Sequence, residues 1–124
     1  MSAWTADELV AFGGPTEIDI TSLRPDGTAR RFVTIWIARL GDELYVRSAY
    51  GPQNGWFLRA NASGLGRIRA AGRERDVAFE APGSEVDQPL DAAYHAKYDQ
   101  YGTAIVGTVV SVESAASTLR LVPR

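Results

Sequence analysis

Cysteine is absent from this sequence, and histidine and lysine each occur once, as His95 and Lys97. A chain without cysteine has no disulfide framework, no thiolate nucleophile and no cysteine-ligated metal. One histidine cannot build a zinc site from imidazole ligands. We therefore expect no metal centre, and any chemistry must come from other groups.

Long apolar runs and a large charge of one sign are missing as well. No segment approaches the length of a membrane-spanning helix, and the N-terminus lacks a basic segment followed by an apolar one. The formal net charge of −2 gives no strong attraction to phosphate backbones. We expect a cytoplasmic protein with no membrane partner and no nucleic-acid partner.

The sequence does contain enough apolar material for one core. Hydrophobic residues make up 45% of the chain, which indicates a single folded domain over residues 1–124. Helical spacing predicts a helix over residues 2–12, with Thr5 and Glu8 as a capping pair, a short helix beginning near Gly55, and a helix over residues 87–101. Strand patterns are found at residues 17–22, 30–39, 43–48, 67–70, 73–81 and 118–122. Residues 105–110 fit either a strand or a buried turn.

Residues 30–61 carry most of the chemical information. Residues 30–39 have apolar side chains on both parities, which predicts a strand covered on both faces. Gly41-Asp42 supplies hairpin turn chemistry, and a glycine-rich loop over residues 49–55 follows the next strand.

This arrangement brings Arg31, Thr34, Arg47 and Ser48 towards a backbone-rich loop. Arginine forks, hydroxyls and close-approaching backbone N–H groups suit an anion. The alternative is a buried hairpin with arginines at its solvent-exposed ends. The residue pattern alone does not decide between an anion site and this hairpin.

Charged residues of the hairpin at 67–81 have a simpler explanation. If residues 71–72 form its turn, Arg67 lies opposite Asp76 and Arg69 lies opposite Glu74. Opposite charges directly across an antiparallel pair stabilise it by about 0.2–1 kcal/mol each. We interpret these four residues as a charged outer face.

Leu90, Tyr94, Tyr98 and Tyr101 are spaced to share one face of the helix predicted at residues 87–101. We expect two of the three tyrosines to pack on the barrel, and either Tyr98 or Tyr101 to stay available as a proton donor or an aromatic wall. His95 falls off this face and is expected to be solvated.

Hydrolytic machinery is not visible. The chain has no nucleophile–base–orienter set and no serine-centred elbow, and its paired carboxylates give no case for a glycosidase. A pocket in which a bound cofactor performs the reaction remains, and such a protein needs few catalytic residues of its own.

As an ordered set, these motifs resemble the split β-barrel flavin- and deazaflavin-binding superfamily, which is pyridoxamine-phosphate-oxidase-like. The likeness is greatest to its deazaflavin-dependent nitroreductase branch and to a small related family of uncharacterised bacterial proteins. It covers residues 16–79 well and residues 117–123 more loosely. It is carried by the basic residues before the strand at 30–39, Gly41-Asp42, Tyr45-Val46-Arg47-Ser48, Gly51, Gly55-Trp56 and Arg59-Ala60-Asn61.

The resemblance implies an α+β, mainly β fold: a six-stranded antiparallel split β-barrel with peripheral helices. It also implies a homodimer with the site near the dimer interface. The implied function is an oxidoreductase that transfers hydride between coenzyme F-420 or FMN and a small organic substrate. The lysine- and serine-rich phosphate loop of deazaflavin reductases is absent, so residues 24–31 would have to replace it.

The cofactor-binding residues that the resemblance implies are Arg31, Val33, Thr34, Arg47, Ser48, Gly51, Gly55, Trp56 and Arg59. Hydride transfer leaves an anion that needs a proton, and Tyr50, Tyr98 and Tyr101 are the candidate donors because His95 falls on another helical face. The alternative function is a non-catalytic split-barrel protein that binds a small molecule or lipid in the same pocket.

Overall fold

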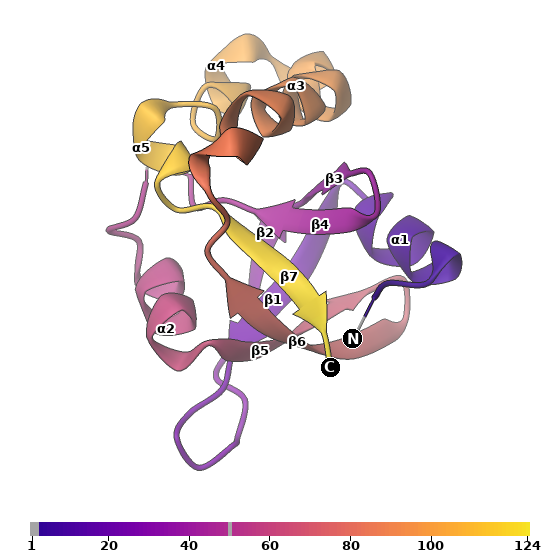
Figure 1. Cartoon of the computed structure of the whole chain (residues 1–124), viewed down its shortest axis with the longest axis vertical. Helices are drawn as coiled ribbons and strands as arrows, with labels where there is room; N and C mark the ends of the chain where they lie inside the picture. The colour runs from indigo at the N-terminus through magenta and orange to yellow at the C-terminus, as the bar shows by residue number, and fades with distance from the viewer. Residues whose placement is uncertain (1–2, 50) are drawn as a thin grey trace.

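The computed structural model describes residues 3–49 and 51–124 (Figure 1). Its centre is a seven-stranded sheet with the order β2-β1-β5-β6-β7-β4-β3, in which every neighbouring pair is antiparallel. The strands are β1 (Glu17–Ser22), β2 (Val33–Trp36), β3 (Ala38–Leu40), β4 (Glu43–Val46), β5 (Leu65–Ala70), β6 (Arg73–Glu80) and β7 (Leu119–Pro123). The helices are α1 (Ala6–Gly13), α2 (Gly55–Ser63), α3 (Asp87–Tyr98), α4 (Thr103–Val106) and α5 (Val112–Ala115), with 3-10 turns η1 (Ser84–Val86) and η2 (Asp99–Tyr101).

The sheet closes into a barrel through a single residue. β2 and β3 stand at opposite ends of the strand order, yet only Ile37 separates them along the chain. One continuous segment therefore joins both ends of the sheet, and the sheet has to curl. The predicted antiparallel barrel is confirmed. It has seven strands rather than six because the strand predicted at residues 30–39 divides at Ile37.

Helix α3 supplies the hydrogen bonds that the sheet cannot make at this division. The N–H of Ile37 donates to the hydroxyl of Tyr98 over 3.1 Å. Lys97 Nζ donates to the carbonyl of Ile37 over 2.9 Å and to that of Gly13, at the end of α1, over 2.9 Å. A buried backbone group without a partner is costly, so these bonds fix α3 against the barrel.

Apolar side chains form two separate cores. The first fills the barrel and includes Ile18, Ile37, Leu44, Ile68 and Leu121 among its most buried members. The second lies outside it, where α3 covers β3 and β4; its members are Ala38, Tyr45, Leu90, Tyr94, Tyr98, Val106 and Val109. Figure 1 shows α3, α4 and α5 gathered at this end of the barrel. Part of the outer cover that strand 30–39 requires therefore comes from the chain's own helix.

Local signals at the N-terminus and in the β5–β6 hairpin are confirmed. Thr5 and Glu8 form a capping box at the start of α1. Arg67 lies opposite Asp76 in the register and makes an ion pair with it over 2.8 Å. Arg69 lies opposite Glu74 as expected, but its ion pair, over 3.3 Å, is made with a carboxylate of β1, Asp19.

The helix predicted over residues 87–101 is shorter than expected. α3 ends at Tyr98 and a 3-10 turn continues to Tyr101, so Tyr101 leaves the buried face and is 50% exposed. Residues 105–110 form the end of α4 and a following turn, so this segment is not a strand. Among the described residues, no helix is long and apolar enough to span a bilayer.

Candidate functional site

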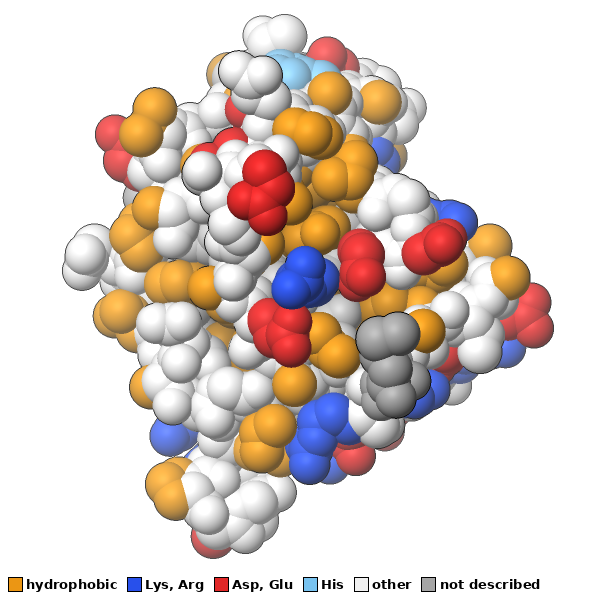
Figure 2. Space-filling model, viewed as in Figure 1, with side chains coloured by type: hydrophobic (Ala, Val, Ile, Leu, Met, Phe, Trp, Pro, Cys, Tyr) orange, Lys and Arg blue, Asp and Glu red, His pale blue; other side chains and the backbone are white. Residues whose placement is uncertain are grey.

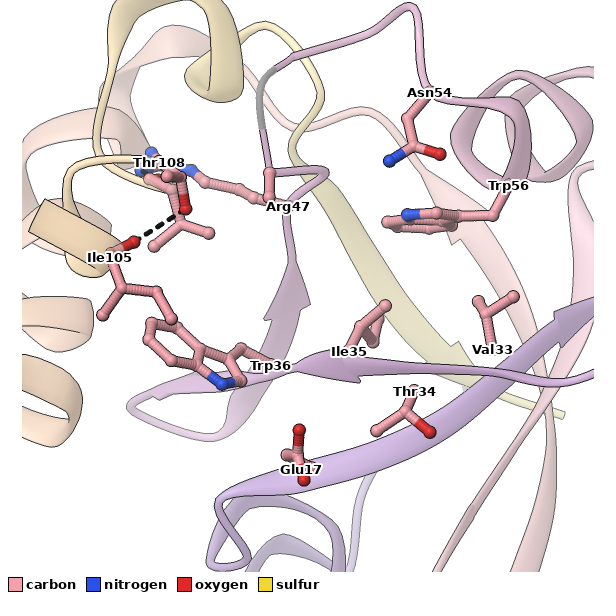
Figure 3. Close-up of a pocket in the computed structure, with 12 residues that line it drawn as sticks. Glu17, Val33, Thr34, Ile35, Trp36, Arg47, Asn54, Trp56, Ile105 and Thr108 are labelled. Carbon is pink, nitrogen blue, oxygen red and sulfur yellow. Dashed lines mark hydrogen bonds between the residues drawn. The ribbon is translucent and has the colours of Figure 1, made fainter. Parts of the chain in front are cut away.

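A cavity of about 340 Å³ lies between β2, the start of α2 and the segment that contains α4 (Figure 3). This volume falls within the range of about 300–1,000 Å³ that is typical of small-molecule sites. The cavity is lined by Glu17, Val33, Thr34, Ile35, Trp36, Arg47, Ala49, Asn54, Trp56, Ile105, Thr108 and Val109.

The floor of the cavity is an edge strand. β2 stands at the end of the strand order with β1 as its neighbour, so alternate N–H and C=O groups of β2 point away from β1. Figure 3 shows Val33 and Ile35 pointing from this strand towards Trp56 of α2. A flat heterocycle could therefore contact apolar side chains and exposed backbone polar groups at the same time.

Trp36 forms a second aromatic wall, and its orientation is fixed from behind. Its ring stacks on Tyr98 with the centroids 3.9 Å apart and the planes 3° apart. Tyr98 itself is completely buried. In Figure 3 the indole of Trp36 lies next to Ile105, at the end of the cavity away from Trp56.

The other end of the groove is basic. A narrow hollow of about 10 Å³ shares Val33 and Trp56 with the main cavity and is also lined by Arg30, Arg31 and Arg59. A wider hollow of about 550 Å³ follows, shares Arg30 and Arg59 with the narrow one and adds Arg24. Among the residues that the structure describes, no acidic side chain lines either hollow.

These arginines keep their charge available. Within residues 3–49 and 51–124, none of the arginines at 24, 30, 31 and 59 makes an ion pair. The Nε of Arg30 is buried and has no hydrogen-bond partner there. An unpaired buried donor is unfavourable, and an anion would satisfy it.

The start of α2 adds to this positive region. Asn54 is the N-cap of this nine-residue helix, but its side chain makes no capping hydrogen bond. The first N–H groups of the helix are therefore not capped by Asn54, and a helix start attracts negative charge. A Cβ at Gly55 would lie 3.0 Å from the guanidinium of Arg59, so Gly55 gives that guanidinium room over the first turn.

Arg47 lines the cavity but is engaged by the protein. Its side chain is fully buried, and Nη1 lies 2.5 Å from Asp91 Oδ1 and donates to the carbonyl of Val109 over 2.9 Å. Nε donates to Thr118 Oγ1 over 3.0 Å. These bonds tie β4 to α3 and β7, whereas the sequence suggested a contact with phosphate.

The loop residues expected beside Arg47 lie behind the cavity. Ser48 is fully buried, and its N–H donates to Ser117 Oγ over 2.8 Å. The N–H of Gly51 donates to the carbonyl of Ser48 over 3.1 Å, and Gly51 adopts φ of 104° against Glu113. Ser48 and Gly51 belong to the segment that packs behind the cavity, and neither residue lines the cavity.

The remaining cofactor candidates do meet around one groove. Val33, Thr34 and Trp56 line the main cavity, and Arg31 and Arg59 line its basic end. The hydroxyl of Thr34 donates to Asp19 over 2.8 Å, so it is already bonded.

Neither Tyr98 nor Tyr101 is placed to donate a proton in the cavity. The hydroxyl of Tyr98 donates to the carbonyl of Thr16 over 2.6 Å, and burial raises its pKa to about 12. The hydroxyl of Tyr101 lies 3.1 Å from Thr16 Oγ1 at the surface, and neither tyrosine lines the cavity. Tyr50 lies outside the described residues. The exposed His95 contacts Asp99 over 2.8 Å, as a solvated histidine would.

Sequence reasoning missed several residues of the lining. Trp36 was counted only as part of an apolar strand, and Glu17 as the start of an alternating, half-exposed strand. Their shared position follows from the β1–β2 register, which places Glu17 opposite Trp36. Ile105 and Thr108 come from a segment that could not be assigned, so no signal pointed to them.

The face of the molecule seen in Figure 2 carries charges of both signs. In Figure 2, acidic and basic side chains alternate over the face on which β6 and β7 lie. The ion pair between Arg120 and Glu80, at 2.9 Å, joins these two strands.

Comparison with solved structures places this fold. The chain is similar to an F-420-H2-dependent reductase, with 12% identity, coverage of 86% of this chain and 93% of that chain, and a TM-score of 0.62. It is similar to HutZ, the haem storage protein of Vibrio cholerae, with 10% identity, coverage of 88% and 82%, and a TM-score of 0.60. A candidate pyridoxamine 5'-phosphate oxidase from Listeria innocua has 11% identity, coverage of 90% and 86%, and a TM-score of 0.57.

These likenesses confirm the split-barrel fold that the sequence resemblance implied. None of the curated proteins matches this chain. The model of the family described as uncharacterized proteins conserved in bacteria (DUF2255) matches residues 8–121, and the chain therefore belongs to that family.

Proposed function

We propose that this protein is an oxidoreductase that binds coenzyme F-420 or FMN and reduces a small organic molecule. The observation that supports this proposal is that an apolar cavity adjoins a basic hollow. The aromatic cavity with Val33, Ile35 and Trp56 shares Val33 and Trp56 with the small hollow that Arg31 and Arg59 line. A cofactor with a flat ring joined to a phosphate has a matching arrangement, because its ring suits the apolar cavity and its phosphate suits the basic hollow.

In this proposal each part of the groove holds one part of the cofactor. Val33, Ile35 and Trp56 contact the ring, and the edge of β2 offers it backbone donors and acceptors. Arg31 and Arg59 hold the phosphate. The bound cofactor would supply hydride, while the protein orients the ring and keeps water from one of its faces.

A fit with the phosphate is supported by the unpaired Nε of Arg30 and by the absence of acidic lining in both basic hollows. Arg24, Arg30 and Arg31 flank the β1–β2 turn and would take the place of a lysine- and serine-rich loop. We favour coenzyme F-420 because the motif order resembles the deazaflavin branch, and FMN is the second candidate.

Binding is tested by titrating the purified protein with F-420, FMN and riboflavin, which lacks the phosphate. We expect micromolar or tighter affinity for one of the two phosphorylated cofactors, and weaker binding of riboflavin than of FMN if FMN is the ligand. A charge-assisted hydrogen bond contributes about 1.5–3 kcal/mol, so Arg31→Ala should weaken binding roughly ten- to a hundredfold.

Arg73→Ala is the matched control. Arg73 is an exposed arginine of the β5–β6 hairpin and lines none of the three hollows of the groove. The Arg73→Ala substitution removes one positive charge, as Arg31→Ala does, but leaves the groove unchanged. Cofactor affinity should therefore stay at the wild-type value. If neither cofactor binds at about 100 μM, well above the micromolar range, the oxidoreductase proposal fails.

A non-catalytic role in binding a small molecule or lipid is the second candidate, and the hydroxyls of the lining favour it. Thr34 Oγ1 donates to Asp19, and Thr108 Oγ1 donates to the carbonyl of Ile105 over 2.7 Å. Neither hydroxyl proton is then free for a bound substrate. Anaerobic oxidation of the reduced cofactor by nitroaromatic compounds separates the two functions, because a binding protein would leave the oxidation rate at its value in buffer.

We also propose that the protein forms a homodimer. The partly exposed side chains of β2 offer a surface that another copy could cover. Light scattering at working concentration tests this, and a monomeric mass would remove a shared-interface site from the proposal.

A further inference from the structure

Two charged residues line the main cavity, and only one of them has a partner. The charge of Arg47 is balanced by Asp91 over 2.5 Å, and Asp87 lies 3.9 Å from it. Glu17 makes no hydrogen bond through its side chain and no ion pair with any residue in the described part of the chain. The cavity therefore carries one uncompensated negative charge.

This charge lies beside an aromatic surface. Glu17 is the direct cross-strand partner of Trp36, so both side chains project from the same face of the β1–β2 pair. Tyr98 covers one face of the indole, and the cavity borders what remains exposed of Trp36. The ring of Tyr101 lies 6.4 Å from that of Trp36 at an interplanar angle of 44° and is half exposed.

An aromatic face next to a free carboxylate is the chemistry that recognises organic cations. The ring quadrupole and the solvent-exposed carboxylate of Glu17 both attract positive charge. At the opposite end of the groove, Arg31 and Arg59 attract anions. The groove is therefore polarised, with a negative aromatic end and a positive end.

We propose that the Trp36 end of the cavity takes a small organic cation, such as an amine or an N-alkylated aromatic heterocycle, and that Glu17 is the residue that sets this specificity. The assignment of this cation as the substrate rests on the proposed function. The preference for positive charge does not, because it depends only on the residues of the cavity.

Three probes of one shape test the preference: para-nitrobenzylamine, para-nitrobenzyl alcohol and para-nitrobenzoate, which are positive, neutral and negative at pH 7. Binding is followed by the indole N–H resonance of Trp36, which is assigned by its loss in Trp36→Phe. We expect the cation to bind roughly tenfold more tightly than the neutral alcohol, equivalent to about 1.4 kcal/mol, and the anion to bind more weakly than the alcohol.

Glu17→Gln keeps the size of the side chain and removes its charge, so the cation should lose its roughly tenfold advantage while the alcohol keeps its affinity. Glu43→Gln, in the exposed β3–β4 hairpin, is the control and should change neither. The proposal is overturned if the anion binds as well as the cation, if Glu17→Gln leaves the preference unchanged, or if the cation does not shift the Trp36 resonance.

The same titration in the presence of F-420 or FMN separates this inference from the proposed function. If the protein prefers the cation but binds neither cofactor, the oxidoreductase proposal fails and the cation-site proposal stands. If it binds a cofactor but shows no preference for the cation, the cation-site proposal fails and the oxidoreductase proposal stands.

Discussion

The hydroxyl of Tyr98 accepts a hydrogen bond from the N–H of Ile37 over 3.1 Å, at the residue where one strand becomes two. Ile37 is the link through which the sheet closes, and the same hydroxyl donates to the carbonyl of Thr16, just before β1. A side chain of α3 thus holds both β1 and the β2–β3 junction. This position explains why a tyrosine that could serve in catalysis is buried as a structural element.

Tyr98→Phe should destabilise the fold and leave ligand binding nearly unchanged. It removes the partner of the Ile37 N–H and of the Thr16 carbonyl while keeping the stack on Trp36. A buried polar group left without a partner costs about 1–3 kcal/mol, so we expect a loss of this size in urea unfolding. Tyr101→Phe is the control, because its hydroxyl is at the surface, and it should change stability by less than about 0.5 kcal/mol. Equal stability of both variants would contradict this role for Tyr98.

Arg47→Ala should act mainly on stability. The change removes the cross-link between β4, α3 and β7 and leaves Asp91 without its cation. Breaking a buried ion pair costs about 3–5 kcal/mol, and we expect the lower end because the side chain of Asp91 is 35% exposed. Thermal and urea unfolding measure the loss. In a double-mutant cycle with Asp91→Asn, the double variant should lose less free energy of unfolding than the sum of the two single variants. Additive losses would show that Arg47 and Asp91 do not stabilise the fold as a pair.

Gly66→Ala should be among the most damaging small substitutions in the barrel. A Cβ at Gly66 would lie 2.2 Å from the backbone oxygen of Thr21 and 2.4 Å from Cζ of Phe79. Overpacking a core costs about 1–3 kcal/mol or more, and here the backbone of β1 would have to move. Gly107→Ala, whose Cβ would meet nothing closer than 3.3 Å, should stay within about 0.5 kcal/mol of wild type. Similar unfolding midpoints for the two variants would contradict the close approach.

The stability of the protein should rise between pH 8 and pH 10 because of Lys97. Burial lowers the pKa of Lys97 to about 8 in the folded state. The unfolded chain then holds a proton that the folded chain releases, and the free energy of unfolding increases with pH in that interval. A neutral amine still has N–H donors for the carbonyls of Gly13 and Ile37.

Lys97→Met should remove this rise, which is on the order of 1–2 kcal/mol for a half-buried group. Urea unfolding of both proteins at several pH values measures the difference. The comparison must stop near pH 10, because burial raises the pKa of Tyr98 to about 12. Above about pH 10 the unfolded chain loses this tyrosine proton while the folded chain keeps it, so the free energy of unfolding falls with pH. Parallel curves for the two proteins would show that Lys97 keeps an ordinary pKa.

The features that could be predicted were those encoded by neighbouring residues. The cap at Thr5, the turn at Gly41-Asp42 and the opposition of Arg67 and Asp76 all depend on residues a few positions apart. The periodicity of the residues predicted the strand segments, and the family resemblance implied that they form an antiparallel barrel. The family resemblance implied one site for Val33, Thr34, Trp56, Arg31 and Arg59, and these residues line two adjoining hollows.

Contacts between distant segments could not be predicted. Whether Arg47 meets an anion or Asp91 depends on where α3 docks, 44 residues away along the chain. The burial of Tyr98 and the exposure of Tyr101 depend on the end of α3 at the Ile37 junction, because the helix is held there by backbone groups that the sheet leaves unpaired. The sequence determined where most of the strands and the longer helices lie and where arginines and aromatics are available. The tertiary structure decided which of these side chains hold the fold and which face the cavity, because a buried polar group bonds to whatever partner the packing places beside it.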